Sequence, residues 1–292
     1  MAIAEPYVPL RPDRGLLKIR RSRQSFEKAG LGDRIGIGLF MFLILVAVAA
    51  PLLAPFSPSV SSGLAFSPPF GGGHLLGTDE VGFDLLSRVL YGLRASLVAV
   101  VVVVTSGVVI GGTIGLVAGV AGRWVDTALM RLTDLFLALP GPVLAIAIVA
   151  ALGPSTLHTL IGVGIIWWPF YARIMRGEVR GLASRPHLEA ALLAGCGPIR
   201  RAVRHLLPGA MPAMLVTASL DVGNLVLTLA SLSFLGLGAA APAPELGAMS
   251  ARGLQYLLQE WWVPVMPGVA IFALALAANV AGDGLRDALG VE

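Results

Sequence analysis

Long runs of residues without charge constrain the fold of this chain more than any other feature. Residues 35–56, 95–122 and 261–282 contain no Lys, Arg, Asp or Glu. Each run reaches the roughly 20 residues that a helix needs to cross about 30 Å of hydrocarbon. Charged residues make up only 13% of the chain, whereas a soluble domain has about 25%. The mean hydropathy is +0.83, and we predict an integral membrane protein.

Two longer apolar stretches supply the remaining spans. Residues 135–172 are too long for one crossing, and Gly153-Pro154-Ser155 interrupts them where a tight hairpin is expected. Residues 206–243 are broken only by Asp221 and supply a sixth span. Backbone groups in lipid must be paired internally, and the alternating pattern of a membrane barrel is absent, so we predict an all-α fold. The six expected spans are residues 35–56, 95–122, 127–152, 156–175, 209–238 and 261–282.

The positions of Lys and Arg predict the orientation of these spans. Of the 21 Lys and Arg, 18 fall in segment 1–34, in the connections near 121–131 and 172–208, and in tail 283–292. Cytoplasmic loops are rich in cations, so both termini are expected in the cytosol. The first apolar run is longer than the core of a cleavable signal, which favours an uncleaved span. Because the basic residues are spread over membrane-facing loops, no nucleic-acid role is expected.

Two connections are expected on the outer side. Connection 57–94 is predicted to contain an interfacial helix that is capped by Thr78 and carries Asp79 and Glu80 in its first turn. Connection 239–260 is rich in Pro and small residues and precedes a Trp pair that suits the membrane interface. Two charged residues in this second connection are candidate contacts for a partner that delivers a ligand, namely Glu245 and Arg252.

A polar, basic insert, residues 187–208, lies between two apolar stretches and is the main candidate for function. Glu189, Ala190 and Ala191 give a helix surface with almost no bulk. Gly195 can adopt the left-handed conformation that ends a helix, and Pro208 is expected to open the next element. A small-residue helix that stays in water favours a docking role. The alternative is an amphipathic loop that lies on lipid headgroups through its arginines.

Asp221 is a charged residue in the middle of an apolar run, and Asn224 lies one turn further on. Charges within a membrane usually mark a pathway or a pair, so both residues are candidates for lining a pathway. The alternative is an Asp221 that is protonated or hydrogen-bonded at a helix contact. No phosphate-binding loop, no nucleophile with a base and no metal-ligand spacing is found, so neither ATP hydrolysis nor a metal site is expected on this chain.

The insert also carries a family signature. Glu189-Ala-Ala-x-x-x-Gly195, followed by Arg204-His205-Leu-Leu-Pro208, resembles the signature of permease subunits in ATP-binding-cassette importers. Four further motifs extend the similarity to the second permease of dipeptide, oligopeptide and nickel importers. They are His74-Leu-Leu-Gly-Thr-Asp-Glu-Val-Gly82, Arg123-Trp-Val-Asp126 with Met130-Arg-Leu-Thr-Asp134, Ala230-Ser-Leu-Ser-Phe-Leu-Gly-Leu-Gly238 and Gly282-Asp-Gly-Leu-Arg-Asp-Ala288. The chain departs from the family pattern at Phe83, where Arg is frequent, at Gly209, where Asn is common, and at Leu229, where an acidic residue often stands.

The resemblance implies the transmembrane domain of a type I importer, with a core permease domain at 95–287 and a cytosolic coupling loop at 176–208. It implies no catalytic residue and no cofactor on this chain, since ATP and Mg would be held by two partner ATPase subunits. The other implied partners are a second homologous permease, an extracytoplasmic solute-binding protein and membrane lipid. The implied ATPase-docking residues are His187, Glu189, Ala190, Ala191, Gly195, Arg200, Arg204, His205 and Pro208.

The resemblance also implies import of short peptides across the bacterial cytoplasmic membrane. Nickel chelates or another small solute such as glutathione are the alternatives within the family. A secondary transporter is the remote alternative, because the matched inverted halves with discontinuous helices that such transporters show are not found.

Overall fold

The structure is a computed structural model that describes residues 31–289, and within them the fold is all-helical apart from two isolated bridges. The long helices are α2 (Leu31–Val48), α4 (Leu85–Val120), α7 (Thr156–Ala183), α10 (Leu207–Phe234) and α12 (Trp262–Leu289). The short elements are α3 (Ala50–Leu53), α5 (Arg123–Leu137), α6 (Gly141–Leu152), α8 (Pro186–Leu193), α9 (Pro198–Arg201), the π-helix η1 (Ala202–Leu206), α11 (Leu246–Gly253) and the 3₁₀ turn η2 (Leu254–Tyr256). Most of the expected N-terminal segment 1–34, and the last three residues of the expected tail, lie outside the described residues.

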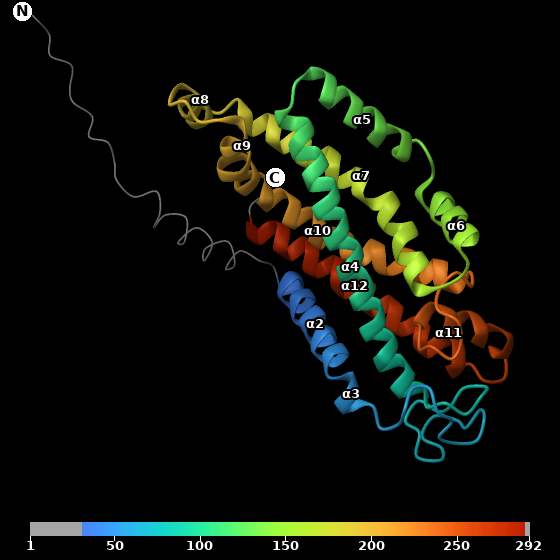
Figure 1. Cartoon of the computed structure of the whole chain (residues 1–292). Coiled ribbons are helices and arrows are strands. Elements are labelled where there is room, and N and C mark those ends of the chain that lie inside the picture. The colour runs from blue at the N-terminus through green and yellow to red at the C-terminus, as the bar shows by residue number, and fades with distance from the viewer. Residues whose placement is uncertain (1–30, 290–292) are drawn as a thin grey trace, which may run out of the picture.

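The helices form an elongated bundle with two different ends (Figure 1). One end carries α8 and α9, and we call it the α8 end. The opposite end carries α11 and the loop between α3 and α4, and we call it the α11 end. The start of α2 lies beside the end of α12, where a Cβ at Gly284 would meet Asp33 and Ile37. The insert and the α3–α4 loop therefore lie at opposite ends of the bundle.

Three helical stretches are long and apolar enough to cross a membrane, namely residues 85–120, 198–234 and 262–287. A fourth candidate is the pair α5 and α6, which are bent by 83° relative to each other. The predicted span at 127–152 is therefore not one straight helix, because α5 ends at Leu137 and α6 begins at Gly141. Pro140 and Pro142 lie at the start of α6 and lack the N–H that would continue the ladder of α5. The expected hairpin is confirmed, with Gly153 at φ +91° and Ser155 capping α7 through the N–H of His158 at 3.1 Å.

Helices α4 and α7 pack closely because three glycines of α4 face α7. A Cβ at Gly107 would meet the Tyr171 ring at 2.9 Å, and one at Gly111 would meet Tyr171 Cβ at 2.7 Å and Ala172 N at 2.9 Å. Gly115 is equally confined, with Met175 Cβ at 2.8 Å. The four-residue spacing places these glycines on one face, as in membrane helix pairs that approach through small residues. This glycine face therefore permits the close packing of α4 and α7.

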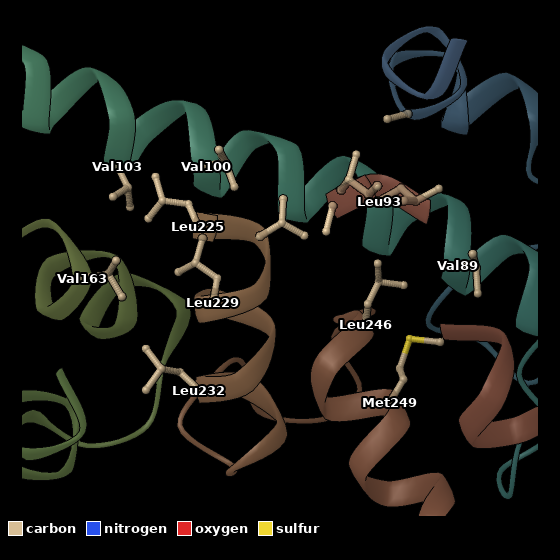
Figure 2. Packing of buried hydrophobic residues seen from close by; sticks show 14 of the residues in the cluster. Val89, Leu93, Val100, Val103, Val163, Leu225, Leu229, Leu232, Leu246 and Met249 are labelled. Carbon is tan, nitrogen blue, oxygen red and sulfur yellow. The ribbon is translucent and has the colours of Figure 1, made fainter. Parts of the chain in front are cut away.

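The larger hydrophobic cluster joins α4, α7, α10 and α11 with α2, α6 and α12, largely in the half of the bundle near the α11 end. Figure 2 shows side chains of α4 meeting those of α7, α10 and α11 across this cluster. Its labelled members are Val89, Leu93, Val100 and Val103 of α4, Val163 of α7, Leu225, Leu229 and Leu232 of α10, and Leu246 and Met249 of α11. This packing makes α11 part of the core although the sequence predicted only a loop over 239–260.

The predicted cap at Thr78 was wrong, because α4 begins only at Leu85 and Asp84 caps it. Asp84 Oδ2 accepts from Ser87 N at 2.8 Å, and Asp84 Oδ1 contacts His74 Nδ1 at 2.8 Å. The hydroxyl of Thr78 is used within the loop instead, where it donates to Leu64 O at 2.6 Å. The helix continues unbroken to Val120, so there is no separate interfacial helix in connection 57–94.

Arg88 ties this loop to the bundle. The side chain is buried, and its guanidinium donates to Pro58 O at 2.8 Å. It also pairs with Asp79 at 3.4 Å and lies 4.8 Å from the centre of the Phe83 ring. A buried arginine needs such partners, because an unpaired charge in a protein interior is costly. Phe83, which departs from the family pattern, therefore has a structural role beside Arg88.

Candidate functional site

The short helix α8 is held to the bundle by one buried side chain. Leu188 is 2% exposed and belongs to the cluster that contains Leu182 of α7 and Leu206 of η1. Glu189 and Ala190, the next two residues of α8, are exposed. The structure thus places the small-residue surface on an exposed, anchored helix. His187 is exposed on the same helix.

Gly195 ends α8 in the way that the sequence predicted. Its φ is +74°, which an L residue adopts only with strain. The Gly195 N–H donates to Leu192 O at 3.0 Å, and the Cys196 N–H donates to Ala191 O at 3.0 Å. This pair of bonds is the Schellman motif, which satisfies carbonyls at the end of a helix and reverses the chain. The turn after α8 is therefore well defined by hydrogen bonds.

The segment after this turn is one continuous helical rod from Pro198 to Phe234, in which α9, η1 and α10 follow without a break. Pro208 lies in the first turn of α10, as the sequence predicted, but no loop separates α10 from the helix before it. Proline lacks an N–H and crowds the preceding turn, and the wide π-helical turn Ala202–Leu206 lies just before it. The insert is therefore joined to α10 by a helix and not by a loop.

Apolar side chains that the sequence analysis did not single out surround the predicted docking surface. Leu193 is 89% exposed and Ile199 is 79% exposed, with Leu192 and Val203 nearby in sequence and also exposed. Three predicted basic residues of the insert are exposed as well: Arg200, Arg204 and His205. Exposed apolar groups with a polar rim are typical of a protein interaction site. Sequence alone did not separate Leu192 and Leu193 from the buried Leu188, because all three suit a core.

A cluster of ion pairs joins α5 to α7 next to the insert. Asp126 of α5 is buried and accepts hydrogen bonds from both Arg176 and Arg180 of α7, with Arg176 Nη2 at 2.9 Å from Oδ2. The two arginines are four residues apart and therefore share one face of α7. The four-residue spacing of the two arginines is the sequence signal that could have indicated this cluster. The end of α7 that leads into α8 is thereby held to a second helix.

Asp221 and Asn224 do not share one environment. Asp221 is 9% exposed, and Trp167 Nε1 of α7 donates to its Oδ2 at 3.1 Å. Asn224 is exposed and lies in line with Thr228 and Ser231, four and seven residues further along α10. Their hydroxyls donate to Asn224 O at 2.8 Å and to Leu227 O at 2.7 Å. The three residues form a polar stripe on an otherwise apolar helix, and we call it the α10 polar stripe.

Glu245 and Arg252 lie at the α11 end but have different partners. The Glu245 carboxylate accepts from Ser233 Oγ and from the Ala239 N–H at 2.5 Å, which ties α11 to the end of α10. Arg252 Nε lies 3.9 Å from Glu80 Oε1 in the α3–α4 loop. The structure therefore does not bring these two predicted contact residues together. Among residues 31–289 no group of three or more His, Cys, Asp or Glu is placed to hold a metal ion.

Long apolar helices in a bundle with a basic, exposed insert at one end define a multi-pass helical membrane protein. The family described as "Binding-protein-dependent transport system inner membrane component" matches residues 111–290. The chain belongs to this family of transport permeases. The matched part contains Gly111 and Gly115 of the α4 glycine face, the insert and the α10 polar stripe.

Relatives of known annotation cover nearly the whole chain. A probable D,D-dipeptide transport system permease of Escherichia coli (strain K12) is 39% identical and is matched over 86% of this chain and 84% of its own length. A di/tripeptide transport system permease of Pseudomonas aeruginosa is 40% identical over 91% of this chain and 89% of its own. A glutathione transport system permease of Pectobacterium atrosepticum is 39% identical over 93% and 91%.

Proposed function

We propose that this chain is one membrane-spanning subunit of an ATP-driven importer of short peptides. Its α8 end faces the cytosol and docks a cytosolic ATPase, and its α11 end faces a solute-binding protein. Six spans accommodate the structure if α2, α4, the α5–α6 pair, α7, α10 and α12 each cross once. Both termini then lie on the cytosolic side of the bacterial cytoplasmic membrane, as the distribution of Lys and Arg favours.

One observation carries the proposal: α8 presents an exposed small-residue surface while its ends are rigidly attached. Leu188 anchors it, the hydrogen bonds at Gly195 close it, and the rod from Pro198 continues into α10. Ala190 and Ala191 allow close approach of a groove, and Glu189 supplies a charged hydrogen-bond acceptor. Movement of a docked ATPase is then transmitted to the helix that carries the α10 polar stripe.

ATP and Mg belong to two partner ATPase subunits in this proposal, and the chain itself is not an enzyme. A second, homologous permease completes the membrane part, so that the α10 polar stripe lines a pathway between two subunits. Closure of the ATPases on ATP favours one global state of the permeases, and hydrolysis returns the other. Membrane lipid covers the remaining exposed apolar faces.

Short peptides are the proposed cargo because two of the relatives described above transport dipeptides or tripeptides by name. The glutathione permease among the relatives favours one second candidate, since glutathione is itself a small peptide. The test is uptake into proteoliposomes that contain the chain, its partner permease, the ATPases and the solute-binding protein. We expect Ala-Ala to accumulate only with ATP. Uptake that persists without ATPases and stops when an ion gradient is removed contradicts the proposal, and uptake of glutathione alone supports the second candidate.

The α10 polar stripe predicts a difference in water access between two exposed positions. In a Cys196→Ser background, Asn224→Cys is expected to react with a membrane-impermeant thiol reagent at least about ten times faster than Phe272→Cys, because thiols need water to ionise and react. Phe272 is an exposed apolar residue of α12 and lies ten residues from the α11 end of that helix. Asn224 lies ten residues from the α11 end of α10, so the two positions are at a similar depth. Labelling rates in the assembled transporter provide the measurement. Equal rates would show that the stripe does not face a water-filled pathway.

A further inference from the structure

A cavity of about 420 Å³ lies between α4, α7, α10 and α11 at the α11 end. Most of its walls are apolar, including Val98, Leu160 and Leu229. Hydroxyl groups of Thr159 and Ser96 also line it. The proposed function does not use this cavity, since the α10 polar stripe and the α8 surface lie elsewhere. Its volume suits a small solute and is too small for a lipid with two acyl chains.

Two opposite charges line this cavity, and neither has an oppositely charged partner among the described residues. Arg94 of α4 is exposed and makes no hydrogen bond or ion pair there. The Glu245 carboxylate accepts only from neutral donors, Ser233 Oγ and the Ala239 N–H. The other two arginines of this end are both paired, Arg88 with Asp79 and Arg252 with Glu80. The wall of this apolar cavity therefore carries one cation and one anion, and neither is paired with an opposite charge among the described residues.

The carboxylate of Glu245 is held in position before any ligand arrives. Its two donors come from the end of α10 and from the turn that follows. A side chain at Gly238 would collide with Ser233 Oγ at 2.6 Å and with Glu245 Cδ at 2.8 Å, so the glycine leaves space for this carboxylate. Each carboxylate oxygen has two lone pairs, and the two bonds leave acceptor capacity for a further donor. Such prior positioning reduces the entropy cost of binding.

We propose that this cavity is a binding site for a zwitterionic short peptide on the permease itself. The peptide carboxylate pairs with Arg94, which can form two parallel hydrogen bonds to it, and the peptide ammonium pairs with Glu245. Thr159 donates its hydroxyl to Leu237 O at 2.6 Å, so its oxygen accepts from a peptide N–H, whereas Ser96 has no hydrogen bond among the described residues. The site rests on the proposed function, because it lies where a peptide would enter from the α11 end.

The test uses the assembled transporter in phosphatidylcholine nanodiscs without the solute-binding protein, and it measures equilibrium binding of three radiolabelled probes. Ala-Ala carries both end charges, N-acetyl-Ala-Ala only the carboxylate, and Ala-Ala-amide only the ammonium. Arg94→Gln is expected to weaken Ala-Ala and N-acetyl-Ala-Ala about tenfold and to leave Ala-Ala-amide unchanged. Glu245→Gln is expected to weaken Ala-Ala and Ala-Ala-amide and to leave the acetylated probe unchanged.

Two matched controls separate this site from general damage. Arg94→Lys keeps the charge and is expected to recover most of the Ala-Ala affinity. Glu260→Gln removes a carboxylate just before α12, at the same end but outside the cavity lining, and is expected to change the binding of no probe. Equal weakening of all three probes by Arg94→Gln would overturn the site. Binding of phosphatidylethanolamine, a zwitterionic lipid, without any binding of Ala-Ala would also overturn the site.

The site and the proposed function fail in distinguishable ways. If the complete transporter imports Ala-Ala with ATP but its membrane part shows no saturable Ala-Ala binding over the millimolar range, the cavity is not a peptide site and the proposed function stands. If the complete transporter imports no peptide, the proposed function itself is wrong.

Discussion

A Glu189→Lys variant is expected to reach the membrane in normal amount and to lose at least about nine-tenths of ATP-driven uptake. Glu189 is exposed in the first turn of α8, so the substitution disturbs neither the Leu188 anchor nor the turn at Gly195. A lysine near a helix N-terminus costs only about 0.3–1 kcal/mol, and α8 should still form. Reversing a charge at a docking surface costs several times more. Uptake of labelled Ala-Ala and immunoblots of the membrane fraction measure the two quantities.

Glu178→Lys is the matched control, since Glu178 is an exposed carboxylate at the α7 end of the coupling loop, before α8, and is not one of the implied docking residues. We expect the transporter with Glu178→Lys to take up labelled Ala-Ala at the normal rate. Copurification of the ATPase subunits should be lost with Glu189→Lys and retained with Glu178→Lys. Normal uptake by Glu189→Lys, or an equal loss in both variants, would contradict docking through α8.

Gly111→Ala is expected to destabilise the bundle by about 1–3 kcal/mol, because overpacking of a close contact forces backbones apart. The new Cβ would meet Trp168 O, Tyr171 Cβ and Ala172 N of α7. Two of these three atoms belong to the α7 backbone, which cannot move without shifting the whole helix. We expect a lower melting temperature of the purified permease complex and reduced amounts in the membrane.

The neighbouring Gly112→Ala provides the control for this prediction. Its Cβ would meet only Met175 Cε and Met214 Cε, each at 3.6 Å, which is an ordinary contact with flexible side chains. Alanine also favours a helix over glycine by about 0.5–1 kcal/mol. Gly112→Ala should therefore keep or slightly raise the melting temperature. Two variants with the same melting temperature would show that the α4–α7 contact is looser than the structure indicates.

The two predictions concern α8 and the α4–α7 contact, which are connected through α7. Helix α7 packs on the glycine face of α4, is braced by Asp126 near its end, and leads directly into α8. The chain then returns through the rod that becomes α10. If an ATPase docks on α8 as proposed, it acts on both α7 and α10, and a close contact between α7 and α4 lets α7 move as a unit.

Several features of function were accessible from the sequence because they depend on residue type and spacing over short distances. Uncharged runs of helix-spanning length define a membrane protein, since each residue meets the same solvent. The turn at Gly195 was predictable because only glycine adopts a positive φ without strain. Gly111 and Gly115 of α4 have the four-residue spacing of a packing face, which is a local signal of the same kind.

The tertiary structure alone decided which polar groups meet. Asp221 and Asn224 lie one turn apart, yet Trp167 covers the first and leaves the second exposed beside Thr228 and Ser231. Thr78 looked like a helix cap, but Leu64 takes its hydroxyl and Asp84 caps α4 instead. Arg94 and Glu245 are far apart in sequence and line one cavity only because α11 packs against α4 and α10. Composition and periodicity carry information about single elements, whereas a pair of charges across a cavity depends on how separate helices are placed in space.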